Sequence, residues 1–238
     1  MKKLLIATTA LVGTASVAAA DVTFSGYGRF GILYEEDRAD GSTIQEETRI
    51  ESRYRLNIDS STETDGGIRF AARIRVEANE NADNSANQGA FSGARFQVSS
   101  GGLRVRVGNI SGVTDAAEVV DYFGFEPGLV GQTGQYANSG VSLPAFASTA
   151  AGANGINVKY EMGDFAFMAS YTDDHSVNDG ASSTTVSAGD SYEIGASYTF
   201  SAWTLGAVYG QFEPAGGGGM EDWIVATLSG TIGIADVS

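Results

Sequence analysis

The sequence predicts an all-β fold, a meander of antiparallel transmembrane strands of the β-barrel type. Apolar and polar residues alternate with a period of two in one segment after another, which is typical of strands whose two faces meet different surroundings. Beyond residue 20 no stretch approaches the ~18 consecutive apolar residues of a membrane-spanning helix. The chain of 238 residues contains no Cys. A small secreted disulfide scaffold is therefore excluded.

Residues 1–20 have the features of a secretory signal peptide. Lys2 and Lys3 precede an apolar run, and three alanines (Ala18, Ala19 and Ala20) stand immediately before Asp21. We therefore expect one domain over residues 21–238, exported through the periplasm. The formal net charge of −15 goes with our expectation that the protein has no nucleic-acid partner.

About eleven alternating segments follow, close to the length that strands need to cross a bilayer. The predicted strands cover residues 21–34, 48–59, 68–78, 91–98, 103–109, 154–162, 165–173, 190–200, 203–213, 221–230 and 231–238. All three prolines fall between the predicted strands, where a missing N–H does no harm.

The connections differ in length between the two ends of the strands. Turns at 163–164 and 201–202 are only a residue pair each, whereas the connection 110–153 is by far the longest. Long loops at one end and short turns at the other are typical of outer-membrane barrels. Phe200 and Trp203 flank one short turn, so we expect them to face outward in an aromatic girdle at the membrane interface.

The segment Ile68 to Val76, IRFAARIRV, shows which face is the inside. It places Arg69, Arg73 and Arg75 on one face and only apolar residues on the other. An Arg facing the bilayer midplane costs about 2–4 kcal/mol, so three would cost on the order of 6–12 kcal/mol. That is comparable to the whole stability of a domain. We therefore expect the arginines to line a water-filled lumen.

The same phase places ten arginines on the lumen wall of the first five strands. They are Arg29, Arg49, Arg53, Arg55, Arg69, Arg73, Arg75, Arg95, Arg104 and Arg106. The long connection 110–153 contains no Lys or Arg but carries four carboxylates: Asp115, Glu118, Asp121 and Glu126. The apolar residues of this connection favour burial, and a loop of this length is rare without a function. We therefore expect it to fold into the barrel, opposite the arginines.

Several segments in order resemble one known family. DVTFSGYGRFGILYEED, RYRLNIDSSTETDGGIRFAARIRVE, VRVGNISG and SYTFSAWTLGAVYGQFE are similar to the α-proteobacterial type of general-diffusion porin. The resemblance implies a homotrimer of outer-membrane barrels with about 16 strands each and a third loop folded inward as a constriction. The resemblance also implies that the ten lumen arginines form the basic side of that constriction and that the four loop carboxylates form its acidic side. On this pattern the chain lacks about five C-terminal strands, so we expect a curled, open sheet.

Three functions remain open at this stage. The first is a porin that lets small hydrophilic solutes and ions diffuse through the bilayer. The second is a structural or adhesive barrel without conductance, which needs an apolar plug. The third is a barrel enzyme, which the single His175 argues against. We expect no cofactor and no catalytic residues; Ca²⁺ at the acidic loops 37–41 and 173–174 is an alternative to solvated loop charge, which we favour.

Overall fold

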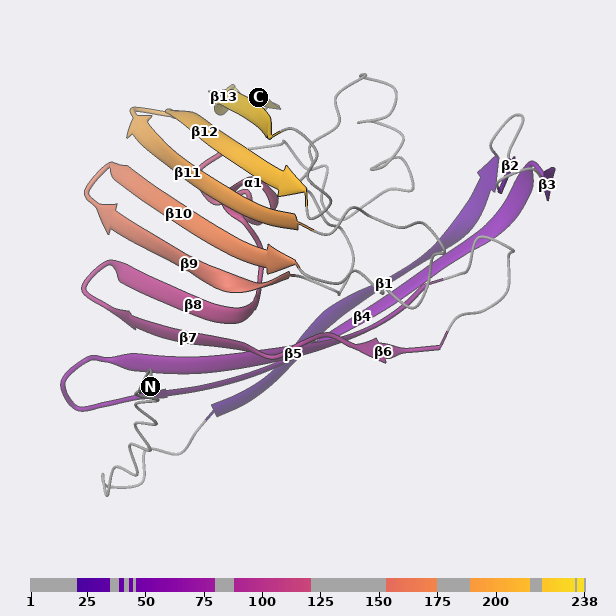
Figure 1. Ribbon diagram of the computed structural model, residues 1–238, viewed down its shortest axis with the longest axis horizontal. Coiled ribbons are helices and arrows are strands. Elements are labelled where there is room, and N and C mark those ends of the chain that lie inside the picture. The colour runs from indigo at the N-terminus through magenta and orange to yellow at the C-terminus, as the bar shows by residue number, and fades with distance from the viewer. Residues whose placement is uncertain are drawn as a thin grey trace, which may run out of the picture.

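The computed structural model describes nine ranges of the chain. They are residues 21–34, 39–40, 43–44, 46–79, 88–120, 153–174, 189–214, 220–233 and 235–237. Within them the fold is almost entirely β-structure (Figure 1). No helix in these ranges has the length and apolar character needed to cross a membrane.

One large antiparallel sheet holds nearly all the strands. Its path runs β1-β4-β5-β7-β8-β9-β10-β11-β12-β13-β14, with β6 paired to β5 off this path, while β2 and β3 form a separate hairpin. The strands are β1 (Asp21–Tyr34), β2 (Ala39–Asp40), β3 (Thr43–Ile44), β4 (Thr48–Glu63), β5 (Arg69–Asn79), β6 (Ala90–Phe91), β7 (Arg95–Ser100), β8 (Leu103–Ile110), β9 (Ala153–Met162), β10 (Phe165–Asp174), β11 (Gly189–Phe200), β12 (Trp203–Pro214), β13 (Glu221–Ile232) and β14 (Ala235–Val237).

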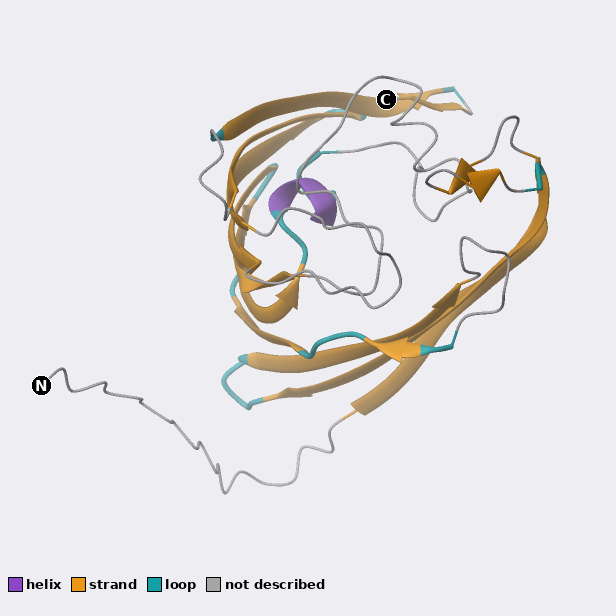
Figure 2. Ribbon diagram, turned by 45° about the vertical axis from the view of Figure 1, so that its right-hand side comes forward, coloured by secondary structure: helices purple, strands orange, loops and turns teal. Residues whose placement is uncertain are grey.

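The predicted all-β meander is confirmed, with local differences. The eleven predicted strands correspond to the eleven strands on the path of the sheet. β4 continues to Glu63, beyond the expected end at residue 59, because its pairing with β5 extends to Glu63 opposite Arg69. The short strands β2, β3 and β6 were not expected. The path is linear from β1 to β14, so the described sheet is curled and open (Figure 2).

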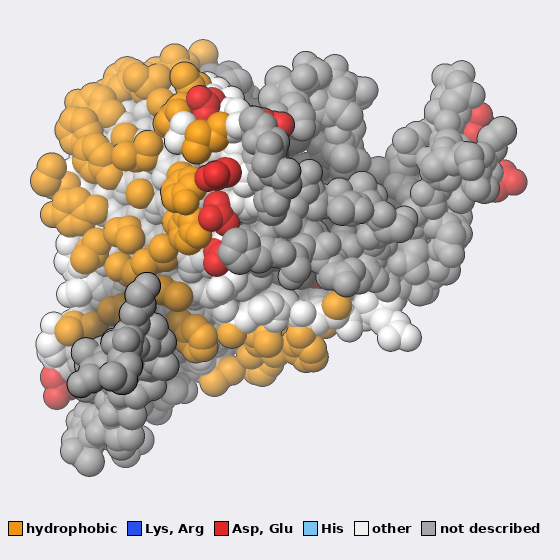
Figure 3. Space-filling view, viewed as in Figure 1, with side chains coloured by type: hydrophobic (Ala, Val, Ile, Leu, Met, Phe, Trp, Pro, Cys, Tyr) orange, Lys and Arg blue, Asp and Glu red, His pale blue; other side chains and the backbone are white. Residues whose placement is uncertain are grey.

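The register gives the sheet two different faces. On β11, the side chains of Ser191 and Glu193 point to the concave face, and each residue is 5% exposed. The next residue, Ile194, points to the opposite face and is 62% exposed. The hydrophobic side chains on the opposite face to Glu193 form a broad surface over the strands (Figure 3). This distribution is the reverse of a soluble protein, since the large apolar side chains lie on the outside.

Aromatic side chains gather on the outer face near the short turns. The rings of Phe165 and Tyr198 stack at 4.5 Å between centroids, and Tyr198 stacks with Phe200 at 5.9 Å. Phe200 is the register partner of Trp203. Trp203 shares its phase with the exposed Leu205 and therefore points outward, as expected. Tyr171 and Tyr192 form a second contact toward the long-loop end, at 5.0 Å.

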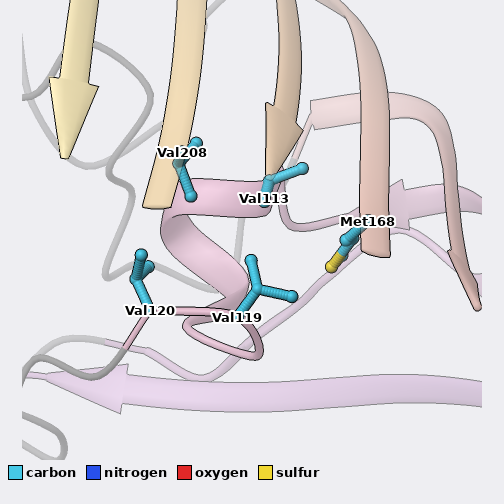
Figure 4. Close-up of a cluster of buried hydrophobic side chains, with 5 residues drawn as sticks. All are labelled: Val113, Val119, Val120, Met168 and Val208. Atoms are coloured by element: carbon cyan, nitrogen blue, oxygen red, sulfur yellow. The ribbon is translucent and has the colours of Figure 1, made fainter. Parts of the chain in front are cut away.

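A single short helix lies on the concave face of the sheet (Figure 2). This helix, α1 (Val113–Ala116), follows shortly after β8 and is capped by Ala117, whose φ of 51° is left-handed. Val113, Val119 and Val120 from this region pack with Met168 of β10 and Val208 of β12 (Figure 4). We call residues 111–120 the inner segment. It forms the only buried apolar cluster found in the described ranges, so the core of this fold lies inside the curl.

Candidate functional site

The strand register brings the predicted arginines onto one face, which we call the basic wall (the concave face of β1, β4, β5, β7 and β8). Arg29 lies opposite Arg53, and Arg73 lies opposite Arg95. On β4 and β5, Arg55 lies opposite Glu77 and Arg75 lies opposite Asn57. On β8, Arg104 lies opposite Ser99 and Arg106 lies opposite Gln97 of β7. Arg69 donates a hydrogen bond to Ser61 Oγ (3.2 Å). The side chains of Arg29 and Arg49 lie outside the described set, although their backbones keep the register.

The basic wall neutralises part of its own charge, which the sequence analysis missed. Glu77 forms ion pairs with Arg55 and, at 3.7 Å, with Arg53. Its side chain is only 4% exposed. Asp59 accepts a hydrogen bond from Arg73 Nε at 2.6 Å. The signal was present in the sequence, because Asp59 and Glu77 have the same phase along their strands as the arginines.

Glu118 of the inner segment meets the basic wall. Its carboxylate accepts hydrogen bonds from Arg104 and, at 2.7 Å, from Arg106 Nη1. Lys159 Nζ of β9 lies 3.2 Å from the same carboxylate. Burial disfavours the charged form, but the hydrogen bond from Arg104 and the charges of Arg106 and Arg104 outweigh it. The pKa of Glu118 is therefore lowered to about 2.

Lys159 is a further residue that the sequence analysis did not assign to the concave face. It is the register partner of Arg104, and it also pairs with Glu161 at 2.7 Å. The segment INVKYEM alternates as the arginine strands do, with Asn157, Lys159 and Glu161 in one phase. Extending the phase argument to this strand would have added Lys159 to the basic side.

Of the other three predicted carboxylates, only Asp115 lies within the described residues. Asp115 lies within electrostatic range of Arg75. Asp121 and Glu126 fall outside the described residues, as does His175. The structure thus brings Asp115 and Glu118 toward the basic wall, and the constriction roles assigned to all four carboxylates remain predictions.

The concave face of β10, β11, β12 and β13 has a different character, and we call it the small-residue wall. Glu193 Oε2 accepts the backbone N–H of Thr114 at 2.6 Å, and Ser170 Oγ accepts that of Val113 at 3.1 Å. Trp223 Nε1 donates to Thr114 Oγ1 at 3.0 Å. None of these wall residues was singled out from the sequence, where only a lone acidic residue among small ones marks the strand.

Metal ligands do not gather anywhere in the described ranges. No group of three or more His, Cys, Asp or Glu residues with the geometry of a metal site occurs there. Most of the loop 37–41 and the side chain of Asp174, to which the calcium alternative referred, lie outside the described residues.

Comparison with known proteins decides the family. The family model described as "Gram-negative porin" matches residues 7–226 of this chain. The chain belongs to the Gram-negative porin family. Members are outer-membrane channels and not enzymes, so membership places the protein in the outer membrane and removes the enzyme alternative.

Relatives and solved structures agree with this assignment. A porin of Fuscovulum blasticum is 34% identical over 160 residues, which are 64% of this chain and 52% of that protein. The chain thus spans about half the length of this curated relative. Among solved structures, a triple mutant of Rhodopseudomonas blastica porin gives a TM-score of 0.60 at 28% identity, covering 88% of this chain and 69% of that one. A structure described under asymmetric conductivity of engineered proteins gives 0.62 at 27% identity, covering 90% and 71%.

Proposed function

We propose that this protein forms a water-filled channel through which small hydrophilic solutes and ions diffuse passively across the outer membrane. The observation that carries the proposal is the contact of Glu118 with Arg104, Arg106 and Lys159. A carboxylate of the inner segment there faces cations of the basic wall, on the concave side of the sheet. Glu118 is in direct contact with these cations, and we place the passage between the remaining charges of the two sides, where groups of opposite sign create a transverse field that orders water.

We assign the constriction, or eyelet, to the two sides already described. The basic side comprises the ten arginines from Arg29 to Arg106 together with Lys159, and the acidic side comprises Asp115 and Glu118. Asp121 and Glu126 extend the acidic side as predictions from the sequence. An apolar solute must displace the ordered water between these sides, so the arrangement favours hydrophilic solutes.

The non-conducting alternative requires an apolar plug on the concave side. The packing of Val113, Val119 and Val120 against the small-residue wall supplies apolar contacts on that half only. The basic wall facing it carries charged side chains, which favour water. This asymmetry supports a channel over a plugged barrel.

Two further features of the family resemblance belong to the proposal. Residues 1–20 act as a signal peptide for export through the periplasm, as their charge and apolar order indicate. The mature protein assembles as a homotrimer in the lipid bilayer. Crosslinking of the complete gene product in outer membranes would give a band of three chains if this is right.

Planar-bilayer recording of the complete gene product tests the proposed channel. We expect stepwise, ohmic conductance that rises with salt concentration. Reversal potentials in a salt gradient then test the eyelet. Replacing Arg104 and Arg106 with Ala shifts selectivity toward cations, while Asp115→Asn with Glu118→Gln shifts it toward anions. Absence of conductance contradicts the channel; unchanged reversal potentials in both variants contradict the eyelet assignment.

A further inference from the structure

The small-residue wall holds the first turn of the inner segment through side chains of three different strands. Glu193 of β11, Ser170 of β10 and Trp223 of β13 all bind the residue pair Val113 and Thr114. The two backbone N–H groups at this turn have no partner within the helix itself, as at any helix start. The small-residue wall provides the acceptors that capping side chains or water supply at other helix starts.

These contacts are buried and dry. Thr114 is 0% exposed, Glu193 5%, Trp223 8% and Ser170 9%. A carboxylate in such a place is costly unless hydrogen bonds stabilise it. The hydrogen bond that Thr114 N–H donates to the Glu193 carboxyl group is short, at 2.6 Å. Loss of this acceptor would leave a buried N–H without a hydrogen-bond partner, and the protein would then bear the full desolvation penalty of that group.

Glycines on the same wall make the close approach possible. A Cβ at Gly195 would lie 2.9 Å from side-chain atoms of Val113, Val119 and Val208, closer than real Cβ contacts come. A Cβ at Gly206 would overlap the carbonyl oxygen of Val119. At these two positions the wall therefore has no room for a side chain beneath the inner segment.

The anchored turn and the charged end of the inner segment are neighbours in sequence. Thr114 is bound to the small-residue wall, and Glu118, one turn of chain further on, is bound to Arg104 and Arg106 of the basic wall. Ala117, which has a left-handed backbone conformation, lies between the contact of Thr114 with one wall and the contact of Glu118 with the other. The position of Glu118 thus depends on where Thr114 is held.

We propose that Glu193, with Trp223 and Ser170, is a latch that positions the constriction: it fixes the inner segment to the small-residue wall so that Glu118 stays opposite the basic wall. The inference rests on the proposed channel function for its consequence, although the latch itself is a structural statement. Glu193 touches no solute. It is a positioning residue that keeps the passage at one width.

Single-channel recording of the complete gene product gives the functional readout. In Glu193→Ala the inner segment loses the side-chain acceptor of Thr114 N–H, and we expect the rate of spontaneous partial closures to rise about tenfold or more. Glu193→Gln keeps an acceptor oxygen and should lie between this variant and the wild type. The control is Ile194→Ala, the next residue on the outer face of the same strand, which should leave the closure rate unchanged.

Fluorescence gives a readout that does not depend on conductance. The chain has only two tryptophans, so Trp203→Phe leaves Trp223 as the sole indole reporter. We expect acrylamide to quench Trp223 poorly in that background and more strongly once Glu193→Ala is added. Ile194→Ala in the same background should not change the quenching.

The outcomes separate the two proposals. A wild type that does not conduct, with quenching that responds to Glu193→Ala, overturns the channel and keeps the latch. A conducting wild type whose closure rate and quenching are the same in Glu193→Ala overturns the latch and keeps the channel. Where Glu193→Ala does not insert, Glu193→Gln and Trp223→Phe decide, and wild-type behaviour of both overturns the latch.

Discussion

The two halves of the concave face use the same strand alternation for opposite purposes. The basic wall points long charged side chains inward and neutralises them in part with Glu77 and Asp59. The small-residue wall points glycines, Ser170 and one carboxylate inward, and the inner segment packs directly on it. The inner segment thus packs and hydrogen-bonds on one wall and forms ion pairs with the other. The comparison shows that different strands supply these two kinds of contact.

The largest expected effect concerns the most buried charge of the basic wall. Glu77→Gln removes the carboxylate that pairs with Arg53 and Arg55, whose side chains are 13% and 11% exposed. Both guanidinium groups would lose this carboxylate, and breaking such a largely buried ion pair costs about 3 kcal/mol in the free energy of unfolding. The midpoint of denaturant unfolding should fall accordingly. Glu161→Gln, on an exposed carboxylate, is the matched control; equal midpoints for both variants would show that Glu77 is unimportant.

The next effect tests the small-residue wall. Gly195→Ala places a methyl group among Val113, Val119 and Val208, and we expect about 2 kcal/mol of destabilisation from overpacking. Gly31→Ala is the control, since a Cβ there meets no atom within 4 Å. Thermal unfolding of both proteins measures the difference. A Gly195→Ala protein as stable as its control would mean that the inner segment does not lie against β11.

A smaller effect concerns the pH dependence of the contact between Glu118 of the inner segment and the basic wall. The pKa of Glu118 is lowered from its ordinary value of 4.5 to about 2 in the folded state by the neighbouring Arg104 and Arg106. Because the folded pKa lies below the unfolded one, its contribution to stability is complete above about 4.5 and disappears as the pH falls toward 2. Ion selectivity should therefore hold from neutral pH to about 3, and a change centred near pH 4.5 that Glu118→Gln abolishes would contradict this.

The smallest effect is expected for the exposed ion pair of the basic wall. The side chains of Arg73 and Asp59 are 33% and 29% exposed. Exposed pairs contribute about 0–1 kcal/mol, so Asp59→Asn should change the unfolding free energy by less than about 1 kcal/mol. Its effect should appear instead as a small shift of the reversal potential toward anion selectivity. A destabilisation as large as that of Glu77→Gln would remove the distinction between buried and exposed pairs on this wall.

Much of the fold could be predicted from the sequence because strand alternation is local. In IRFAARIRV, a register change of one residue would exchange the arginines with the apolar side chains, so a single segment already selects the inward face. The same reasoning located the short turns at 163–164 and 201–202, and the outward position of Trp203. It applied equally to β9, where it would have placed Lys159 on the basic side.

What the tertiary structure alone decided are the contacts between the inner segment and the strands. Thr114 meets Glu193 across 79 residues of sequence and Trp223 across 109. No local pattern encodes such pairs, because they depend on how far the sheet curls and where the loop enters it. The choice of Glu118 as the carboxylate that contacts Arg104, Arg106 and Lys159 has the same origin. By itself the sequence determined which residues face inward; the curvature of the sheet determined which of them meet.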